Sequence, residues 1–468
     1  MTSIKIENPY TLEIVAEVPF LSLPEAQAKV DSSANFAHTW KKVPLEERIK
    51  VVRSGLSNLW KMSSVVAEDI TKMIGKPISQ SLEEMRVAQL SSARLVDIAP
   101  RALDDVVVLD TPLLYKKITK EPLGVVLTMA PYNSPVHIAL NQILPAIVSG
   151  NTVLVKHSPY TAPITRYFTE AFAQAGVPHL ITDFFVQVKD MPKLLENRSI
   201  NYVNFVGSVE SGKELYQTLA DARIMDVGLH LGAKNAAYVR HDADIDVAVK
   251  DIVNCALYNA GQSATSIERI LVDERVYEKF MELAMKEMMQ QRIGDPMDEA
   301  TTIGPLPSPD APARLTALIE EAVQGKCTVK CGGSATADEA GKGRFFEPTL
   351  LCDLEDYMRV FVSSRQSEEF FGPIVAVDAA GSDEEVMKRI NALPYGLSTS
   401  IYTADKAKAL QLAAQVETGT VLMNACRVMD PELPWCGWKD SGKHAMLSHY
   451  CYRYVTRTKS YYIQTKAA

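Results

Sequence analysis

Short apolar runs that stop at turn-forming residues, each followed by a helical segment, recur along this chain and limit its fold more than any other feature. The clearest runs are Val125–Met129, Thr152–Val155 and Tyr202–Val206, which end at Pro131, Lys156 and Gly207. Alternating strands and helices of this kind predict an α/β protein with parallel sheets. In such a fold a nucleotide site lies at the carboxyl ends of the strands. The 468 residues suffice for two or three packed domains.

Later segments fit the same class. Val276 to Gln291 has the pattern of an amphipathic helix that stops before Gly294, and Ser382 to Ala392 predicts another helix, with Ser382 and Glu385 at capping-box spacing. The last twenty residues predict a strand, because Thr, Val and Ile alternate there with tyrosines, namely Tyr450, Tyr452, Tyr454, Tyr461 and Tyr462.

Charge and cysteine content exclude several classes of function. The net charge is -8 and the basic residues are scattered, so neither a nucleic-acid partner nor an anionic membrane is expected. No apolar run is long enough to span a bilayer, and the first residues lack a secretory pattern. The odd number of cysteines, seven, indicates a reducing, cytoplasmic setting. Cys327 and Cys331 lack a second ligand pair nearby, so we predict no metal site.

Two turns carry possible chemistry. Phe205–Gly212 places small residues between a strand and a helix, where backbone N–H groups can face a phosphate, although it lacks a full dinucleotide fingerprint and resembles an ordinary turn. Pro131–Pro135 contains Asn133, whose amide could hold an oxyanion, or which could simply belong to a Pro-rich turn. Lys156 follows a strand and could reach ribose hydroxyls or remain solvated.

Further segments occur at a characteristic order and spacing: Leu229–Asn235, Asn259–Arg269, Glu369–Pro373 and Pro434–Gly442. Together with the two turns, these segments resemble the aldehyde dehydrogenase superfamily from Asn8 to about Lys459. Members oxidise an aldehyde by thiolate attack, hydride transfer to a nicotinamide and thioester hydrolysis. The resemblance implies an aldehyde substrate and NAD or NADP as cofactor.

Site residues follow from the same resemblance. Asn133 would be the oxyanion donor, Lys156 would contact the adenosine ribose with Ser158 beside it, and Glu369 would bind the nicotinamide ribose. The other implied positions are Gly207, Ser208 and Gly212 along the pyrophosphate, Phe371 and Gly232 near the nicotinamide, and Tyr132, His137, Arg427 and Trp435 in the substrate tunnel.

Two positions depart from the family pattern. Ala264 stands where the family has its nucleophilic cysteine, and a methyl group cannot form a thiohemiacetal. His230 stands where the general base is normally a glutamate, and an imidazole with a pKa of about 6.5 can also accept a proton. Three explanations remain open: an engineered Cys-to-Ala change, a natural pseudoenzyme that kept its nucleotide site, and an esterase in which His230 activates Ser263 or water.

Cofactor and substrate preference also stay open. Members that prefer NAD often have a glutamate at the position of Pro159, so its absence admits NADP. A charged His157 would favour the 2′-phosphate, but we expect an exposed, uncharged histidine at neutral pH. Arg427 could clamp a substrate carboxylate or form a structural ion pair, whereas Tyr132, Trp435 and Trp438 suit an aromatic or apolar aldehyde.

The resemblance also implies a domain plan. We expect a Rossmann-type cofactor domain in residues 1–102 and 121–231, an α/β catalytic domain in 232–448, and a small β arm in 103–120 and 449–468. In the family such an arm joins subunits, so a homodimer or homotetramer is expected.

Overall fold

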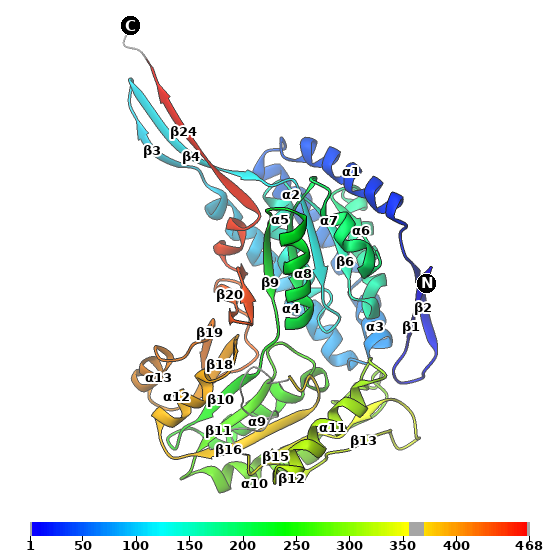
Figure 1. Ribbon diagram of the computed structural model, residues 1–468, viewed down its shortest axis with the longest axis vertical. Coiled ribbons are helices and arrows are strands. Elements are labelled where there is room, and N and C mark those ends of the chain that lie inside the picture. The colour runs from blue at the N-terminus through cyan, green and yellow to red at the C-terminus, as the bar shows by residue number, and fades with distance from the viewer. Residues whose placement is uncertain (1, 355–368, 466–468) are drawn as a thin grey trace.

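Two parallel sheets and a projecting three-stranded arm make up the computed structural model, which describes residues 2–354 and 369–465 (Figure 1). The first sheet has the order β22-β9-β8-β5-β6-β7, with every pair parallel except β22 and β9. Its strands are β5 (Val125–Ala130), β6 (Thr152–His157), β7 (Ile181–Asp183), β8 (Ile200–Val206), β9 (Asp226–His230) and β22 (Gly442–Lys443).

Alternating apolar residues bury both faces of the first sheet. Val126 and Val153 pack into one core cluster, whereas Leu127 and Leu154 pack into another on the opposite face. The helices of this half are α1 (Leu23–Trp40), α2 (Leu45–Lys61), α3 (Ser63–Ile74), α4 (Ile78–Leu103), α5 (His137–Val148), α6 (Thr165–Gln174), α7 (Met191–Leu195) and α8 (Val209–Ala222). An N-terminal hairpin of β1 (Ser3–Glu7) and β2 (Ile14–Pro19) lies at its side (Figure 1).

The second sheet lies below the first in Figure 1 and has the order β12-β15-β16-β11-β10-β18-β19. All of its neighbours are parallel except β12 and β15. Its strands are β10 (Asn235–Val239), β11 (Ile267–Asp273), β12 (Thr328–Cys331), β15 (Thr349–Cys352), β16 (Ile374–Ala380), β18 (Ser398–Tyr402) and β19 (Thr420–Met423). Its helices are α9 (Ile245–Leu257), α10 (Tyr277–Met289), α11 (Ala311–Gln324), α12 (Asp383–Asn391) and α13 (Lys406–Ala413).

Three short pairs complete the strands. They are β13 (Ala335–Thr336) with β14 (Phe345–Phe346), β17 (Tyr395–Gly396) with β21 (Trp438–Lys439), and β20 (Trp435–Cys436) with β23 (Ala445–Met446).

The arm consists of β3 (Val106–Asp110), β4 (Leu114–Pro122) and β24 (Thr456–Gln464), which form one antiparallel sheet that extends away from the body (Figure 1). The prediction of one strand over the last twenty residues is wrong for its first part. Tyr450 and Tyr452 lie in a 3-10 turn, His449–Arg453, because Tyr452 is buried there and its hydroxyl donates to the carbonyl of Leu95.

The predicted α/β class and its main elements are confirmed. The three predicted strands became β5, β6 and β8, and the two predicted helices became α10 and α12. Ser382 caps α12 by accepting the backbone N–H of Glu385.

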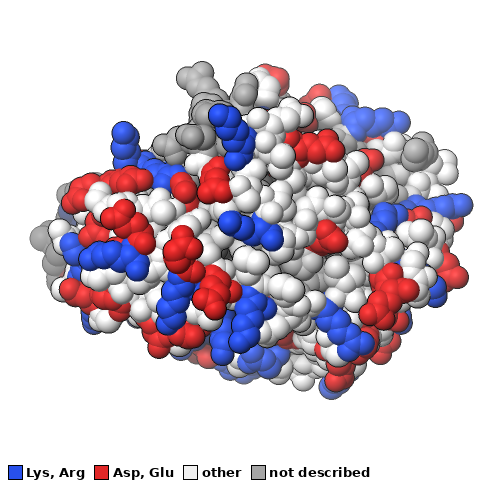
Figure 2. All heavy atoms as spheres, turned by 90° about the horizontal axis from the view of Figure 1, so that it is seen from below, with Lys and Arg blue, Asp and Glu red and all other residues white. Residues whose placement is uncertain are grey.

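Acidic and basic side chains are interspersed on the lower face of the molecule (Figure 2). Within the described ranges, no helix is both long and apolar enough to cross a membrane.

Candidate active site

A cavity of about 1000 Å³ separates the two sheets. Its upper wall comes from the residues that follow β5, β6, β8 and β9, and its lower wall from residues that precede β11, β16 and β18. The cavity therefore lies between the carboxyl edge of the first sheet and the amino edge of the second. The predicted site residues that line it are Tyr132, Asn133, His137, Lys156, Ser158, Gly207, Ser208, His230, Gly232, Ala264, Glu369, Phe371, Arg427 and Trp435.

Gly212 is the predicted position that does not line this cavity. A Cβ atom at Gly212 would lie 2.4 Å from Cδ2 of Leu231, so glycine is required for helix α8 to pack against the strand exit. This contact gives Gly212 a role in packing, and its position along the pyrophosphate stays a prediction. Ser208, by contrast, lines the cavity and caps α8 by accepting the N–H of Ser211 at 3.2 Å.

The loop that carries Ala264 has a constrained backbone. Asn259, Ala260 and Gly261 are consecutive left-handed residues, with φ of 53°, 52° and 74°. A Cβ on Gly261 would lie 1.9 Å from the carbonyl oxygen of Gly372, so two loops meet there backbone to backbone. Because left-handed non-glycine residues are costly, this geometry is expected where function fixes the backbone.

Asn133 lies across the cavity wall from this loop. Its Nδ2 donates to the carbonyl of Gln262 at 2.9 Å, and the Tyr132 hydroxyl donates to Oε1 of Gln262 at 3.0 Å. One amide N–H of Asn133 therefore orients the side chain, and the second can serve a ligand oxygen.

His230 ends β9 and is buried beside β22. Its Nδ1 has no hydrogen-bond partner among the described residues. Burial lowers the pKa of His230 to about 3, with a smaller contribution from His444. The imidazole is therefore neutral at physiological pH, and the ordinary imidazole pKa does not apply at this position.

Glu369 and Glu268 approach the cavity from the second sheet. Glu369 accepts the N–H of Ala233 at 2.7 Å, and Glu268 accepts the Lys234 ammonium at 2.9 Å and the N–H groups of Phe370 and Phe371. Burial, and then the charge of Glu268, raise the pKa of Glu369 to about 8.

The segment Glu369–Phe371 is fixed from both sides. Arg314, on α11, donates to the backbone carbonyls of Glu369 and Phe370, at 3.2 and 2.5 Å. Phe371 has a φ of 44°, which is costly for an aromatic residue. Carboxylate and aromatic ring are thus both held rigidly at the cavity.

Lys156 and Ser158 lie at the end of β6. The Lys156 side chain is buried, and burial lowers its pKa. His157 points into the core instead, where its nitrogens contact the Thr165 hydroxyl at 2.7 Å and the carbonyl of Pro135 at 2.9 Å. Burial lowers the pKa of His157 to about 4, so its imidazole is uncharged at neutral pH. The expectation that this side chain is exposed is wrong, because it packs in the core.

The charged groups near the part of the cavity that we predict to hold the substrate form ion pairs with one another. Arg427 forms an ion pair with Glu83 at 3.1 Å and stacks 3.9 Å from the ring centroid of Tyr258. Lys76 and Glu84 form a fully buried pair at 2.7 Å, and Glu84 also accepts the N–H of His137. Arg427 was predicted either to clamp a substrate carboxylate or to form a structural ion pair, and the structure shows the ion pair.

Comparison with known proteins decides the family. The model of the aldehyde dehydrogenase family matches residues 1–461. This chain belongs to the aldehyde dehydrogenase family. It is 30% identical over 448 residues to a lactaldehyde dehydrogenase of Methanococcus vannielii, covering 93% of this chain and 92% of that protein.

Solved aldehyde dehydrogenases share the whole fold. An NAD-dependent enzyme of Sinorhizobium meliloti superposes with a TM-score of 0.94 at 26% identity, over 100% of this chain and 92% of that one. An NADP-dependent glyceraldehyde-3-phosphate dehydrogenase of Bacillus halodurans, in complex with NADP, gives 0.90 at 26% identity, over 99% and 96%. The family oxidises aldehydes with NAD or NADP, and members with either preference share this architecture.

The aldehyde dehydrogenase cavity of this chain fits a dinucleotide. It combines the capped N-terminus of α8 and the buried ammonium of Lys156 on the upper wall with the carboxyl of Glu369 on the lower wall. In the described ranges, no cluster of three or more His, Cys, Asp or Glu is arranged to hold a metal ion.

Several residues of this site escaped the sequence analysis. Glu84 and Arg314 lie in helices α4 and α11 without any recognised motif, and only the fold brings them to the cavity. Lys76, in the loop between α3 and α4, pairs with Glu84. Glu268 and Lys234 lie inside recognised segments, yet their pairing depends on the contact of two loops.

Proposed function

We propose that this chain has the site of an NAD(P)-dependent aldehyde oxidation that lacks only its nucleophile, so that as it stands it binds NAD(P) and an aldehyde without completing the oxidation. The observation that carries the proposal is that Ala264 lines the cavity together with Asn133 and His230. Formation of the thiohemiacetal requires a bond from sulfur to the aldehyde carbon, and the Ala264 methyl group offers no lone pair for it.

The remaining groups keep roles in binding. Asn133 donates its free amide N–H to the aldehyde oxygen, Ser208 and the first turn of α8 face the pyrophosphate, and Glu369 faces the nicotinamide ribose. NAD(P), when bound, supplies the hydride acceptor. Phe371, held at a fixed backbone angle, packs beside the ring.

A thiol elsewhere does not replace the nucleophile in this proposal. Cys255 is buried and donates to the carbonyl of Thr265 at 3.3 Å. Burial raises the pKa of Cys436, which keeps that thiol protonated and unreactive.

Restoration of the thiol tests this proposal. We expect the Ala264→Cys protein to form NAD(P)H with an aldehyde panel, at a rate on the order of 10³-fold above the parent chain. Ala264→Ser, with similar volume but no thiol, is the matched control and stays inactive. An Ala264→Cys protein that binds dinucleotide but oxidises no aldehyde would sink the proposal and leave a binding protein.

The esterase alternative has weaker support. The Ser263 hydroxyl contacts the Thr265 hydroxyl at 2.8 Å and accepts the backbone N–H of Thr265, so it is engaged within its own loop. Cleavage of a nitrophenyl ester without NAD(P), abolished in His230→Ala, would establish this activity instead.

An aromatic or apolar aldehyde is the substrate class we propose. Tyr132, Trp435 and two methionines, Met429 and Met446, line the cavity, while Arg427 is already neutralised by Glu83. In the restored protein, benzaldehyde should have a higher kcat/KM than a semialdehyde that carries a carboxylate. The reverse order would show that Arg427 leaves Glu83 to bind substrate.

Assembly and location complete the proposal. Cofactor binding is assigned to residues 1–102 and 121–231, catalysis to 232–448 and subunit contact to the arm. Exposed apolar side chains on β3, among them Val106, Val107 and Val108, support a homodimer or homotetramer joined through the arm. Light scattering would give the mass, and a monomer at micromolar concentration would refute the assembly.

Seven free cysteines support a cytoplasmic location. Localisation of a tagged chain in its own cells would test this.

A further inference from the structure

A buried ion pair lies beside the turn that carries Asn133. Lys76, between α3 and α4, pairs with Glu84 of α4 at 2.7 Å, and the exposed fractions of the two side chains are 0% and 2%. Moving two opposite charges out of water costs about as much as their attraction returns, so such a pair is a weak stabiliser. What the two side chains contact therefore matters more than the attraction between them.

Glu84 holds the end of the turn. Its Oε1 accepts the backbone N–H groups of Val136 at 2.9 Å and of His137 at 3.1 Å, while its Oε2 accepts the Lys76 ammonium. These N–H groups lie at the start of α5, directly after the Pro131–Pro135 turn, where backbone donors lack partners within the helix. One carboxylate thus fixes the point at which the turn meets the helix.

Lys76 contacts Asn133 itself. Its ammonium donates to the backbone carbonyl of Asn133 at 3.4 Å, and Nδ2 of Asn259 donates to the same carbonyl at 3.4 Å. Burial acts to lower the pKa of Lys76, but the charge of Glu84 outweighs it, so the pKa is raised and the ammonium stays charged. A charged donor holds a carbonyl more strongly than a neutral one. Asn133 is therefore held at its backbone by the pair and at its side chain by Gln262.

Helix α4 holds the Ala264 loop as well. Oε1 of Gln80 accepts the backbone N–H of Asn259 at 2.8 Å, and the carbonyl of Gln80 accepts the Tyr258 hydroxyl at 3.2 Å. Asn259 is the first of the consecutive left-handed residues of that loop, and so costly a backbone persists only where its surroundings fix it. The start of one helix thus fixes both the turn with the amide donor and the loop with Ala264.

We propose that the Lys76–Glu84 pair and Gln80 are positioning residues for the oxyanion donor. Together they set the free amide N–H of Asn133 where it meets the oxygen of an aldehyde held beside Ala264. The inference rests on the proposed function, since it requires an aldehyde in the cavity. None of the three needs to touch that aldehyde, because they act through the turn and the loop. A donor stabilises an oxyanion only if it is already in place, since a hydrogen bond weakens steeply as its angle closes.

A chromophoric aldehyde tests the inference on the chain as it stands. The absorption of para-dimethylaminobenzaldehyde moves to longer wavelength when its carbonyl oxygen accepts a hydrogen bond, so the spectrum of the bound aldehyde reports whether the donor is in place. Ala264 cannot form a thiohemiacetal, so the aldehyde stays intact. We expect a red shift on binding to the parent chain and none in Asn133→Ala.

A variant of the pair must not leave a lone buried charge. Lys76→Met combined with Glu84→Gln is neutral, and the glutamine oxygen can still accept the N–H groups of α5, so the contact to Asn133 is what is lost. We expect this double variant to lose at least half of the red shift, with aldehyde affinity within about threefold of the parent chain. Gln80→Ala, at a partly exposed position, should lose a smaller part of the shift.

Turnover supplies a second readout in the Ala264→Cys background. A misplaced oxyanion donor should lower kcat by about tenfold to a hundredfold, since complete loss of one donor costs roughly 10²–10³-fold, and should leave the KM for NAD(P) unchanged. The matched control is Lys72→Met combined with Glu68→Gln, which removes an exposed ion pair of α3 and should change neither readout. Thermal melting confirms that each variant is folded.

Two outcomes overturn the inference alone. A full red shift in the folded double variant would show that Asn133 keeps its place without the pair, and if that variant does not fold, a full red shift in Gln80→Ala has the same meaning. Equal losses of aldehyde and dinucleotide affinity, with the red shift of the bound aldehyde preserved, would indicate a packing role. Failure of the parent chain to bind the aldehyde at all would refute the proposed function together with the inference.

Discussion

The carboxyl edges of the two parallel sheets are both rich in polar residues, yet only the first borders the cavity. At the first edge, Asn133, Lys156 and His230 follow β5, β6 and β9 and face the space between the sheets. The second sheet turns its amino edge to the cavity, with Ala264 and Glu369 just ahead of β11 and β16. Its carboxyl edge points away from the site.

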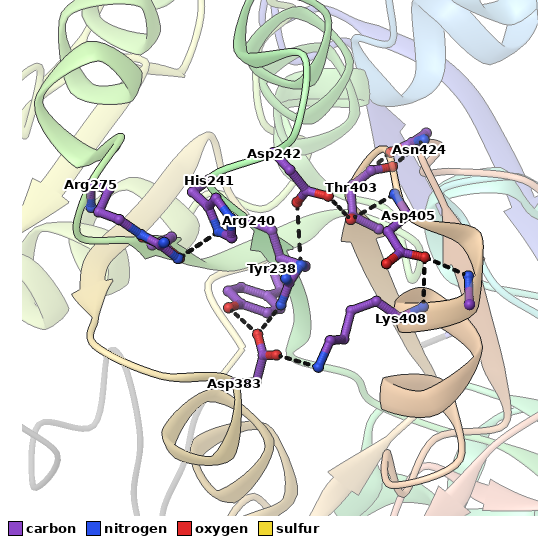
Figure 3. Close-up of polar contacts among 12 residues, drawn as sticks. Tyr238, Arg240, His241, Asp242, Arg275, Asp383, Thr403, Asp405, Lys408 and Asn424 are labelled. Carbon is purple, nitrogen blue, oxygen red and sulfur yellow. Dashed lines mark hydrogen bonds and ion pairs between the residues drawn. The ribbon is translucent and has the colours of Figure 1, made fainter.

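At the second carboxyl edge the polar groups satisfy one another (Figure 3). Asp383, which follows β16, accepts the Tyr238 hydroxyl at 2.7 Å, contacts Arg240, and pairs with Lys408 at 3.2 Å. Nearby, Asp273 contacts His241 at 3.3 Å and Arg275 at 2.6 Å. Each charge in this network has a partner of opposite sign.

The contrast between the two carboxyl edges shows that polar residues at strand ends do not by themselves identify a ligand site. Carboxyl edges favour ligands because loops diverge there, but a loop set that neutralises its own charges leaves nothing for a ligand to complete. Among the residues that the structure describes, Lys156 forms no ion pair and Nδ1 of His230 has no hydrogen-bond partner, which distinguishes the first edge from the second.

The largest expected effect on stability comes from removing Asp383, which joins several groups of the network at the second carboxyl edge. Asp383→Ala leaves Arg240, Lys408 and Tyr238 without their shared acceptor. We expect a loss of about 2–3 kcal/mol in the free energy of unfolding, below the value for a fully buried pair because Asp383 keeps 18% exposure. Urea denaturation measures this loss.

Dinucleotide affinity should stay unchanged in Asp383→Ala, because the network lies away from the cavity. Asp246→Ala, which removes an exposed ion pair with Lys279, is the control and should leave the urea midpoint in place. If Asp383→Ala weakened dinucleotide binding, the two edges would not be independent.

Removal of the Lys156 charge should raise the free energy of unfolding, whereas removal of Asp383 should lower it. Lys156→Met replaces a buried ammonium by an apolar side chain of similar length, so we expect the ligand-free protein to gain about 1 kcal/mol. Lys234→Met is the matched comparison, since it leaves Glu268 uncompensated and must destabilise. Destabilisation by both substitutions would mean that Lys156 has an internal partner after all.

Local pattern was sufficient to predict the elements of the first edge. The strands Val125–Met129 and Tyr202–Val206 were predictable because apolar runs bounded by turns need only neighbours in sequence. The same holds for the turns that carry Asn133 and Ser208, and for the family segment around Ala264. These signals placed almost all of the predicted site residues on one cavity.

Long-range pairing was not predictable. Nothing in the sequence around Arg427 indicates that Glu83, more than 300 residues earlier, neutralises it. The pKa of His230 was unpredictable for the same reason, since its burial depends on the return of β22 to the first sheet. Tyr452 is an example of a local prediction that failed, because its burial against α4 overrode its strand propensity.

The smallest expected effect tests whether Glu369 shares the unpaired character of the first edge. Its pKa is raised to about 8, so between pH 4.5 and 8 the folded chain holds a proton that the unfolded chain has released. Stability from this group is therefore fully present at low pH, falls as pH rises through that window, and reaches its minimum above pH 8. Glu369→Gln removes the dependence, and its melting temperature relative to the parent should rise by about 2 °C between pH 5 and pH 9. Glu46→Gln, at an exposed position on α2, controls for the loss of one carboxylate. A constant difference in melting temperature across this range would mean that Glu369 is ionised throughout and that Lys234 compensates both Glu369 and Glu268. The charges that the second sheet brings to the cavity would then be paired, like those at its carboxyl edge.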